Sequence, residues 1–135
     1  MKSPNQTFKK AERLCSRKKI SGLFESGNYF YTTHFKIIWD FATNDQPFPV
    51  QVMFSVSKRN FRHAVHRNLI KRRMREAYRK QKYILYEHLT ESDLKVAFIA
   101  LFIRDKIENY SIFETETKEI LETLITSIKG KVKIC

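Results

Sequence analysis

The stretch "RNLIKRRMREAYR", Arg67 to Arg79, determines how the rest of the chain is interpreted. It holds six Lys or Arg and a single acid, Glu76. At about 100° of rotation per residue, a helix through this stretch aligns one set of mostly apolar side chains within about 60° of arc. The set extends to residue 85 and consists of Ile70, Met74, Ala77, Gln81, Ile84 and Leu85. A disordered segment has no reason to keep this register, so a helix with one side in the core is predicted.

The opposite side of this predicted helix is basic. Its residues are Asn68, Lys71, Arg72, Arg75, Arg79 and Lys82, and Arg73 and Lys80 flank the apolar stripe. A solvated helix face usually mixes charges, because like charges four residues apart destabilise a helix. A membrane-binding helix needs large apolar residues beside the basic ones, and here the core uses them. Arginine binds phosphate through two parallel hydrogen bonds, so we expect this face to bind nucleic acid.

Positive charge is concentrated in the same part of the chain. The net charge is +12, and residues 58–82 hold 11 Lys or Arg against one acid. Residues 87–135 instead hold 7 Lys or Arg and 9 Asp or Glu. This distribution indicates a polyanionic partner. The chain has 135 residues, of which 42% are hydrophobic, and this length and composition suit one globular domain.

Compartment and domain boundaries follow from simpler features. No segment has the apolar length of a membrane span, and the first residues lack a signal peptide's apolar core. Cys15 and Cys135 are too far apart in sequence to indicate a disulfide framework or a CxxC metal site, so a cytoplasmic location is expected. Residues 1–15 are polar and basic and are predicted to form a flexible arm, with residues 16–135 as the folded domain.

The segments before the basic helix are predicted to be a short helix and two strands. Ser16 is a suitable N-cap and Gly27 a suitable C-cap for a first helix over 17–26. Alternating apolar residues within 28–45 and over 50–57 predict two half-buried strands. Because the turn "TNDQPFP" separates them, the two strands are predicted to form a hairpin.

A strand and a helix are predicted after the basic helix. The run "DLKVAFIALFIR", 93–104, is almost wholly apolar, which is typical of a strand that has a parallel neighbour and is covered on both faces. Apolar residues at helical spacing from Phe113 to Ile128 predict a last helix with an acidic outer face. We expect four glutamates on that solvated face, not in a two-metal nuclease centre. They are Glu114, Glu116, Glu119 and Glu122.

No motif for catalysis by the protein itself is present. His63 and His66 are three residues apart, but no third Cys or His lies near them, so no metal site is expected. The three glycines are scattered and form no phosphate-binding loop. We therefore expect no catalytic residue and no cofactor bound by a protein motif.

Three segments resemble the bacterial ribonuclease P protein family. The segment "RNLIKRRMREAYR" matches the family signature, and "FSVSKR", Phe54 to Arg59, resembles the strand before it. The segment "ERLCSRKKISGLFESG", Glu12 to Gly27, resembles the N-terminal helix. The chain departs from the family at residues 60–63, which lack the usual glycine, and at Ile20, where a phenylalanine is common. An aliphatic Ile20 lacks the π-face on which a base stacks.

The resemblance implies a fold and a function. The fold is α+β, a single-domain α-β sandwich with a left-handed βαβ crossover, like the second domain of a ribosomal small-subunit protein. The function is that of the protein subunit of ribonuclease P, an endoribonuclease whose RNA performs the hydrolysis with bound Mg²⁺ during tRNA 5′ maturation. The implied partners are ribonuclease P RNA and precursor tRNA, and we expect a monomer in a 1:1 complex with the RNA and no membrane contact.

The helix face and the resemblance together predict two binding sites. The site for the catalytic RNA comprises Lys58, Arg59, Arg62, Arg67, Asn68, Lys71, Arg72, Arg75 and Arg79. The site for the 5′ leader, beside the first helix, comprises Lys18, Lys19, Ile20, Phe24, Tyr31, Lys36 and Ile38. Phe24 fits a core position equally well, and either Tyr29 or Tyr31 could stack on a leader base. The alternatives are a ribosomal or structured-RNA-binding module with no enzymatic partner, and a stand-alone nuclease.

Overall fold

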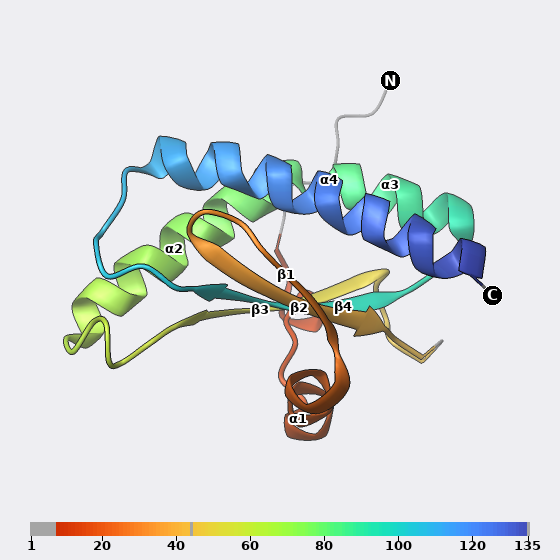
Figure 1. Cartoon of the computed structure of the whole chain (residues 1–135), viewed down its shortest axis with the longest axis horizontal. Helices are drawn as coiled ribbons and strands as arrows, with labels where there is room; N and C mark the ends of the chain where they lie inside the picture. The colour runs from red at the N-terminus through yellow and green to blue at the C-terminus, as the bar shows by residue number, and fades with distance from the viewer. Residues whose placement is uncertain (1–7, 44, 135) are drawn as a thin grey trace.

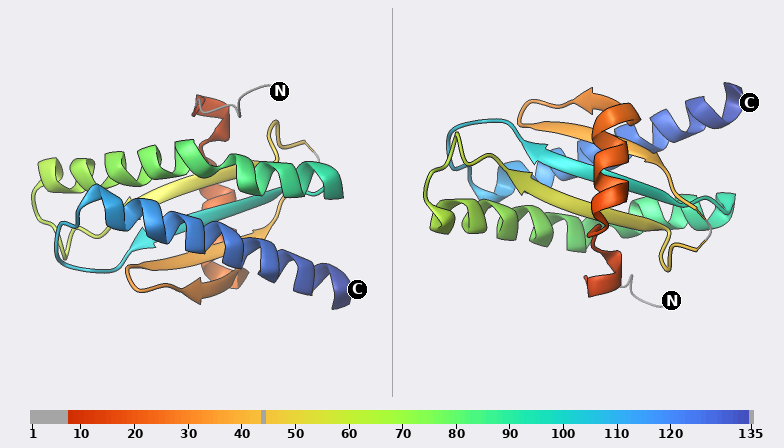
Figure 2. Two further views of the ribbon diagram at one scale, coloured as in Figure 1. Left: turned by 90° about the horizontal axis from the view of Figure 1, so that it is seen from above. Right: turned by 90° about the horizontal axis from the view of Figure 1, so that it is seen from below.

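The computed structural model describes residues 8–43 and 45–134 (Figure 1). The strands are β1 (Asn28–Tyr31), β2 (Phe35–Phe41), β3 (Val50–Val56) and β4 (Val96–Phe102). The helices are α1 (Arg17–Ser26), α2 (Ala64–Gln81), α3 (Tyr83–Ser92) and α4 (Tyr110–Ile134), with a short 3₁₀ helix, η1 (Lys10–Glu12), before them. Helices α2, α3 and α4 cover one face of the sheet, and α1 crosses the other face (Figures 1 and 2). None of the described helices is long and apolar enough to cross a membrane.

The strand order is β1-β2-β4-β3, so the predicted pairing of β2 with β3 is wrong. Strand β4 lies between them, antiparallel to β2 and parallel to β3. The hairpin is formed instead by β1 and β2, with Tyr31 opposite Lys36. The almost wholly apolar β4 accounts for this order, because a central strand buries both faces and adds a parallel neighbour, as predicted for residues 93–104.

Helices α2 and α3 connect β3 to the adjacent parallel strand β4, and this crossover is left-handed (Figure 2). Right-handed crossovers are by far the more common arrangement, so the handedness distinguishes this fold. Because α2 begins just after β3, its N-terminus and the loop at 57–63 lie near the edge where β3 and β4 end. The fold therefore places the basic loop and the basic helix beside one end of the sheet.

The main core lies between the sheet and the three helices. Trp39 and Phe98 from the sheet are buried, and Ile70, Met74 and Ala77 from α2 are buried against them, as the predicted stripe required. Tyr78, which was not in that stripe, is also buried. Gln81 is half-buried, and its Nε2 donates to the carbonyl oxygen of Glu114 in α4 at 2.8 Å. The buried side of α2 is therefore wider than the sequence pattern indicated.

A smaller core lies on the opposite face, beneath α1. Leu14, Leu23, Ile38, Ala97 and Ile99 are buried there, with Ile20 packed beside them. The predicted caps of α1 are present, since the amide of Lys19 donates to Ser16 Oγ and the amide of Gly27 to the carbonyl oxygen of Leu23. A Cβ at position 27 would lie 2.8 Å from Cγ2 of Ile38, so glycine permits the close approach of the end of α1 to β2.

The N-terminal segment, residues 8–15, packs on the domain. Phe8 lies edge-on to Phe54 and Tyr78, with ring centroids 6.2 and 5.7 Å apart. The amide of Leu14 donates to the carbonyl oxygen of Val52 at 2.9 Å, which places the segment along the edge of β3. The part of the predicted arm that the structure describes is thus held against the sheet, and residues 1–7 lie outside the described residues.

Candidate nucleic-acid interface

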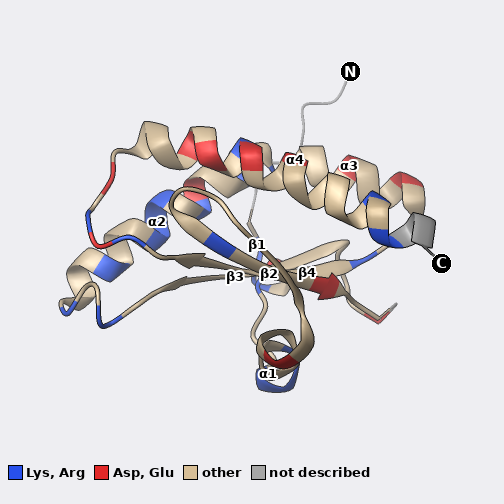
Figure 3. Ribbon diagram, in the orientation of Figure 1, with Lys and Arg blue, Asp and Glu red and all other residues tan. Residues whose placement is uncertain are grey.

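Charge is segregated on the surface. Figure 3 shows lysines and arginines along α2 and in the loop before it, and most of the acidic residues on α3, α4 and the loop before α4. Helix α2 packs on the main core through Ile70, Met74, Ala77 and Tyr78, so its basic residues lie away from the sheet. The fold therefore presents the predicted basic face of α2 at the surface.

Lys71, Arg72 and Arg75 form the uncompensated part of this face. Arg72 is exposed, whereas Lys71 and Arg75 are half-buried. Partial burial lowers the pKa of Arg75, and the positive charges of Arg13 and Arg72 lower it further. Among the residues that the structure describes, no acidic side chain pairs with any of these three. Such a group of cations favours a bound anion, and guanidinium groups fit phosphate geometry.

Arg13 extends this cation group from α2 onto the N-terminal segment. A surface pocket of about 200 Å³ is lined by Arg13, Lys71 and Arg75 together with apolar groups. The guanidinium carbon of Arg13 lies 5.4 Å from the centre of the Phe8 ring. Arg13 could not be assigned to a site from the sequence, because it lies in a segment without periodicity, remote in sequence from α2.

Arg67 contributes to the loop rather than to the outer face. Its Nη1 donates to the carbonyl oxygens of Phe61 at 2.7 Å and of Arg62 at 2.9 Å. The loop carries three of the predicted RNA-binding residues, which are all exposed. They are Lys58, Arg59 and Arg62. Asn68 is exposed one position beyond Arg67. Arg67 therefore fixes the path of the loop that its exposed neighbours occupy.

Two members of the predicted basic face have acidic partners. Arg79 binds Glu76 through two hydrogen bonds of 2.6 and 3.1 Å, which raise the pKa of Arg79 and lower that of Glu76. Lys82 is only 2% exposed and forms an ion pair with the buried Glu12. The prediction that Lys82 lies on the open basic face is wrong, because the N-terminal segment covers it.

The sheet face beside α1 provides a second surface. Lys36 pairs in register with Tyr31 on one side and with Leu101 on the other, and Ser55 continues this row on β3. On α1, Arg17 and Phe24 lie within about 60° of Ile20 and form one flank of the helix. The opposite flank, with Lys19, lines a separate pocket of about 220 Å³ over Asp40 and Ala97. The flank with Phe24 therefore faces the row that contains Lys36.

The exposed Tyr29 and Tyr31 form a cluster with the half-buried Lys36 on this surface. The two tyrosine rings lie edge-to-face with centroids 6.1 Å apart, and they are 64% and 59% exposed. Nζ of Lys36 lies 5.1 Å from the centre of the Tyr29 ring and 5.6 Å from that of the Tyr31 ring. Exposed aromatic rings beside a cation are suited to stacking with unpaired bases. Phe24, at 53% exposed, is a surface residue rather than a core residue.

Three residues of the predicted leader site lie elsewhere. Ile38 is 4% exposed and belongs to the core under α1, so RNA cannot contact it while α1 is in place. Lys19 lies on the flank of α1 that faces away from Lys36. Lys18 is exposed and lies about 160° around the helix from Ile20, on the side away from the sheet. The sequence placed Ile38 and Lys36 on one face correctly, but it did not show that α1 crosses that face directly above Ile38.

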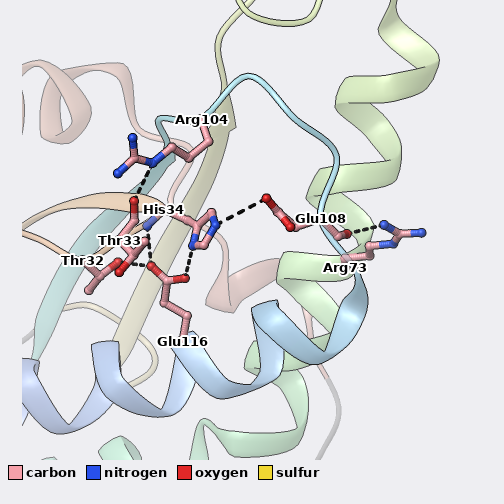
Figure 4. A network of polar contacts seen from close by, with 7 residues as sticks. All are labelled: Thr32, Thr33, His34, Arg73, Arg104, Glu108 and Glu116. Carbon is pink, nitrogen blue, oxygen red and sulfur yellow. Dashed lines mark hydrogen bonds and ion pairs between the residues drawn. The ribbon is translucent and has the colours of Figure 1, made fainter.

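A polar network holds the β1–β2 turn against α4 (Figure 4). Oε1 of Glu116 accepts hydrogen bonds from Thr32 Oγ1 and from the amide of His34, both at 2.5 Å, and Oε2 lies 2.6 Å from His34 Nδ1. Glu116 is 5% exposed, so its predicted place on the solvated face of the last helix is wrong. Arg104 donates to the carbonyl oxygen of Thr33 at 2.7 Å. The network fixes the hairpin that carries Tyr29, Tyr31 and Lys36.

Comparisons with known proteins indicate the family of this chain. The family model described as Ribonuclease P matches residues 8–125. The chain is 28% identical over 118 residues to the ribonuclease P protein component of Porphyromonas gingivalis, covering 87% of this chain and 86% of the relative. It is 30% identical over 128 residues to that of Chlorobium phaeobacteroides, covering 87% and 88%.

Solved structures show the same fold. The RNase P protein of Staphylococcus aureus superposes with a TM-score of 0.63 at 20% identity, covering 85% of this chain and 96% of that structure. The RNase P protein of Thermotoga maritima superposes with a TM-score of 0.62, also at 20% identity and with the same coverage. The predicted single α+β domain is confirmed. Since the family model spans most of the chain, the chain belongs to the ribonuclease P protein family.

Proposed function

We propose that this chain, as the protein component of ribonuclease P, binds two RNAs through two separate surfaces. The face of α2 with the loop before it binds the catalytic RNA. The sheet surface beside α1 binds the unpaired 5′ leader of precursor tRNA. The observation that carries the proposal is the group of Lys71, Arg72 and Arg75, which has no acidic partner within the described residues and gains a counter-charge only from a bound anion.

The first surface suits a structured RNA. Its cations come from a helix and a loop fixed by Arg67, so their spacing is set before RNA binds. Phosphate contacts of this kind supply affinity and fix the register of the complex without reading the sequence. Lys58, Arg59, Arg62 and Asn68 extend the surface from α2 across the loop, and Arg13 extends it along the edge of β3.

The second surface suits a single strand. Tyr29 and Tyr31 offer exposed aromatic rings, and Lys36 between them offers a charge for the backbone. Stacking on aromatic rings contributes about 1–3 kcal/mol per base and tolerates any base, as an enzyme acting on many precursors requires. Arg17 and Phe24 border the same surface from α1. Tyr31, Lys36, Ile20 and Phe24 therefore stay in the proposed leader site, whereas Ile38, Lys18 and Lys19 do not.

The protein contributes positive charge to the complex and positions the precursor tRNA. The described residues contain no group of three or more His, Cys, Asp or Glu that could hold a metal ion, so we place the Mg²⁺ of the reaction on the RNA. Cations on α2 offset the repulsion between the two RNAs, and the leader site holds the precursor in register. We propose a complex of one chain with one RNA.

Reconstitution at low magnesium tests the proposal. The purified chain, ribonuclease P RNA and a precursor tRNA are combined at a Mg²⁺ concentration at which the RNA alone cleaves poorly. We expect cleavage at the 5′ end of the mature tRNA only when RNA and protein are both present. Binding to the RNA without any rise in cleavage would favour a structured-RNA-binding module. Cleavage by the protein alone would indicate a stand-alone nuclease.

A further inference from the structure

A buried ion pair joins the N-terminal segment to the junction of α2 and α3. Nζ of Lys82 donates to Oε1 of Glu12, and the Tyr86 hydroxyl donates to the same oxygen at 2.5 Å. The amide of Lys9 donates to Oε2 of Glu12 at 2.6 Å. The side chains of Glu12 and Lys82 are only 2% and 3% exposed. The carboxylate of Glu12 thus connects residues 9–12 with residues 82–86.

A gain in stability does not by itself explain why the fold contains this buried ion pair. Two charges lose their hydration on burial, and their attraction often does no more than offset that cost. An apolar pair of similar volume would frequently hold the two segments as well. A buried ion pair differs from an apolar contact in requiring one particular geometry, because either charge left without its partner is strongly destabilising.

The geometry that this pair fixes is that of the adjacent residue, Arg13. Arg13 forms an isolated parallel bridge with Val52, at the edge of β3. There it lines the same pocket as Lys71 and Arg75. Arg75 and Lys82 are seven residues apart, or about two helical turns, so both point toward the N-terminal segment. Glu12 neutralises the charge of Lys82. Arg13, in contrast, adds a third positive charge beside Lys71 and Arg75.

Placing Arg13 beside two other cations is unfavourable in the free protein. Burial lowers the pKa of Arg75, and repulsion from Arg13 and Arg72 lowers it further. The segment would relieve the repulsion by moving Arg13 away if residues 10–14 were loosely attached. Hydrogen bonds to β3, from the amide of Leu14 to the carbonyl oxygen of Val52 and from Gln51 to that of Ala11, hold the segment at the sheet edge, and the buried pair adds a contact that opposes this movement from the side of α2 and α3.

We propose that Glu12, Lys82 and Tyr86 form a clamp that positions Arg13 against Lys71 and Arg75, so that the RNA-binding surface continues from α2 across the edge of β3. The three clamp residues are positioning residues and do not themselves touch RNA. The inference rests on the proposed binding of ribonuclease P RNA by α2. Phosphate groups of that RNA would occupy the pocket between the N-terminal segment and α2.

A double-mutant cycle with the full chain and ribonuclease P RNA tests the clamp. Glu12→Gln with Lys82→Met removes both charges while keeping side chains of similar size, and the single amide oxygen of Gln can still accept from Tyr86 or from the amide of Lys9. Arg13→Ala alone should weaken RNA binding about two- to fivefold, the range for one exposed ionic contact. It should also reduce the slope of log affinity against log salt by about one.

The clamp variant should reproduce both effects of Arg13→Ala, although it retains Arg13. Combining Arg13→Ala with the clamp variant should weaken binding no further, because an arginine that is out of position contributes nothing. Arg72→Ala serves as the control. Its fold loss of RNA affinity should multiply with the loss from Arg13→Ala or from the clamp variant when the changes are combined. Wild-type affinity and salt slope in a folded clamp variant would overturn the inference, as would effects that multiply with that of Arg13→Ala.

Two further outcomes separate the inference from the function on which it rests. If Arg72→Ala weakens binding and Arg13→Ala does not, the clamp fails while the α2 surface stands. If neither change affects binding, the α2 surface itself fails. Should the clamp variant not fold, Tyr86→Phe removes one hydrogen bond and keeps both charges. It should weaken binding to a smaller extent, with no effect in the Arg13→Ala background, and unchanged affinity would again overturn the clamp.

Discussion

Arg67 donates a hydrogen bond to the carbonyl oxygen of Phe61 at 2.7 Å and thereby joins α2 to the loop that precedes it. Phe61 is 6% exposed and packs in the main core, so the loop is fixed from both sides. Arg62 is held through its own carbonyl oxygen by the same guanidinium nitrogen. The first arginine of the signature thus determines where the exposed cations of the loop lie.

Replacing Arg67 with Ala should lower affinity for the catalytic RNA mainly by loosening this loop. The change removes two hydrogen bonds from a charged donor, and each contributes about 1.5–3 kcal/mol to holding the loop. Hydrogen exchange should show faster exchange of the amides at 59–63, with little change in the sheet. Arg72→Ala is the control and should lower affinity without altering that exchange. Unchanged loop exchange in the Arg67 variant would assign Arg67 to direct RNA contact instead.

Reversing two charges on α2, Arg72→Glu with Arg75→Glu, should abolish most RNA binding without unfolding the domain. Neither side chain has an acidic partner among the described residues, and the change relieves repulsion from Arg13. The salt slope should fall by about one for each phosphate that the variant no longer neutralises. A control with the same change in net charge is Lys118→Glu with Lys129→Glu, on the exposed side of α4. Equal weakening in the two variants would show that only net charge matters.

The basic face of α2 was predictable because its pattern lies within a single helix. The positions of Ile70, Met74 and Ala77 fix which side is buried, and the opposite side follows from the helical period. The partner of Lys82 was not predictable in this way, since Glu12 lies 70 residues away. The predicted pairing of β2 with β3 was wrong for the same reason, because β4, from a distant part of the chain, lies between them.

The position of Glu116 could have been found in the sequence. It follows Phe113 by three residues and precedes Ile120 by four, so the helical period places it on the buried side of α4. Grouping it with Glu114, Glu119 and Glu122 by residue type obscured this spacing. The sequence could not identify its partners, because Thr32 and His34 belong to a turn that reaches α4 only in the folded domain.

Replacing Glu116 with Ala should destabilise the domain by about 2–4 kcal/mol, because the half-buried donors of Thr32 and His34 lose a buried acceptor. Glu119→Ala, at an exposed position of the same helix, should change stability by less than about 0.5 kcal/mol. Urea denaturation of both variants measures the difference. Similar midpoints for the two variants would contradict the role of Glu116 in holding the hairpin.

Acid should weaken the contact between Glu12 and Lys82. Burial raises the pKa of Glu12, but hydrogen bonds from Lys82, Tyr86 and the amide of Lys9, with the charge of Lys82, outweigh this and leave it below its ordinary value of 4.5. A carboxyl whose pKa is lowered by folding stabilises the native state above its unfolded pKa, and this contribution disappears as the pH falls through the folded pKa.

Denaturation of the wild type and of the Glu12→Gln, Lys82→Met variant between pH 7 and pH 3 measures this contribution. The difference in free energy of unfolding between wild type and variant should be constant above about pH 5. Below about pH 4.5 the wild type should lose stability relative to the variant. Other titrating groups are common to both proteins and cancel in the difference. A difference that does not change with pH would show that Glu12 is not held ionised by its partners.

The separation of the two RNA surfaces is tested most directly by tRNA binding to the holoenzyme assembled with Lys36→Ala. Affinities for precursor and mature tRNA are measured side by side, with Lys129→Ala on α4 as the control. Lys36 lies beside Tyr29 and Tyr31, on the face of the sheet opposite to α2, so assembly with the catalytic RNA should be unchanged. We expect weaker binding of precursor tRNA, by about two- to fivefold, and unchanged binding of mature tRNA. Equal weakening for both tRNAs, or a failure of assembly, would contradict the account.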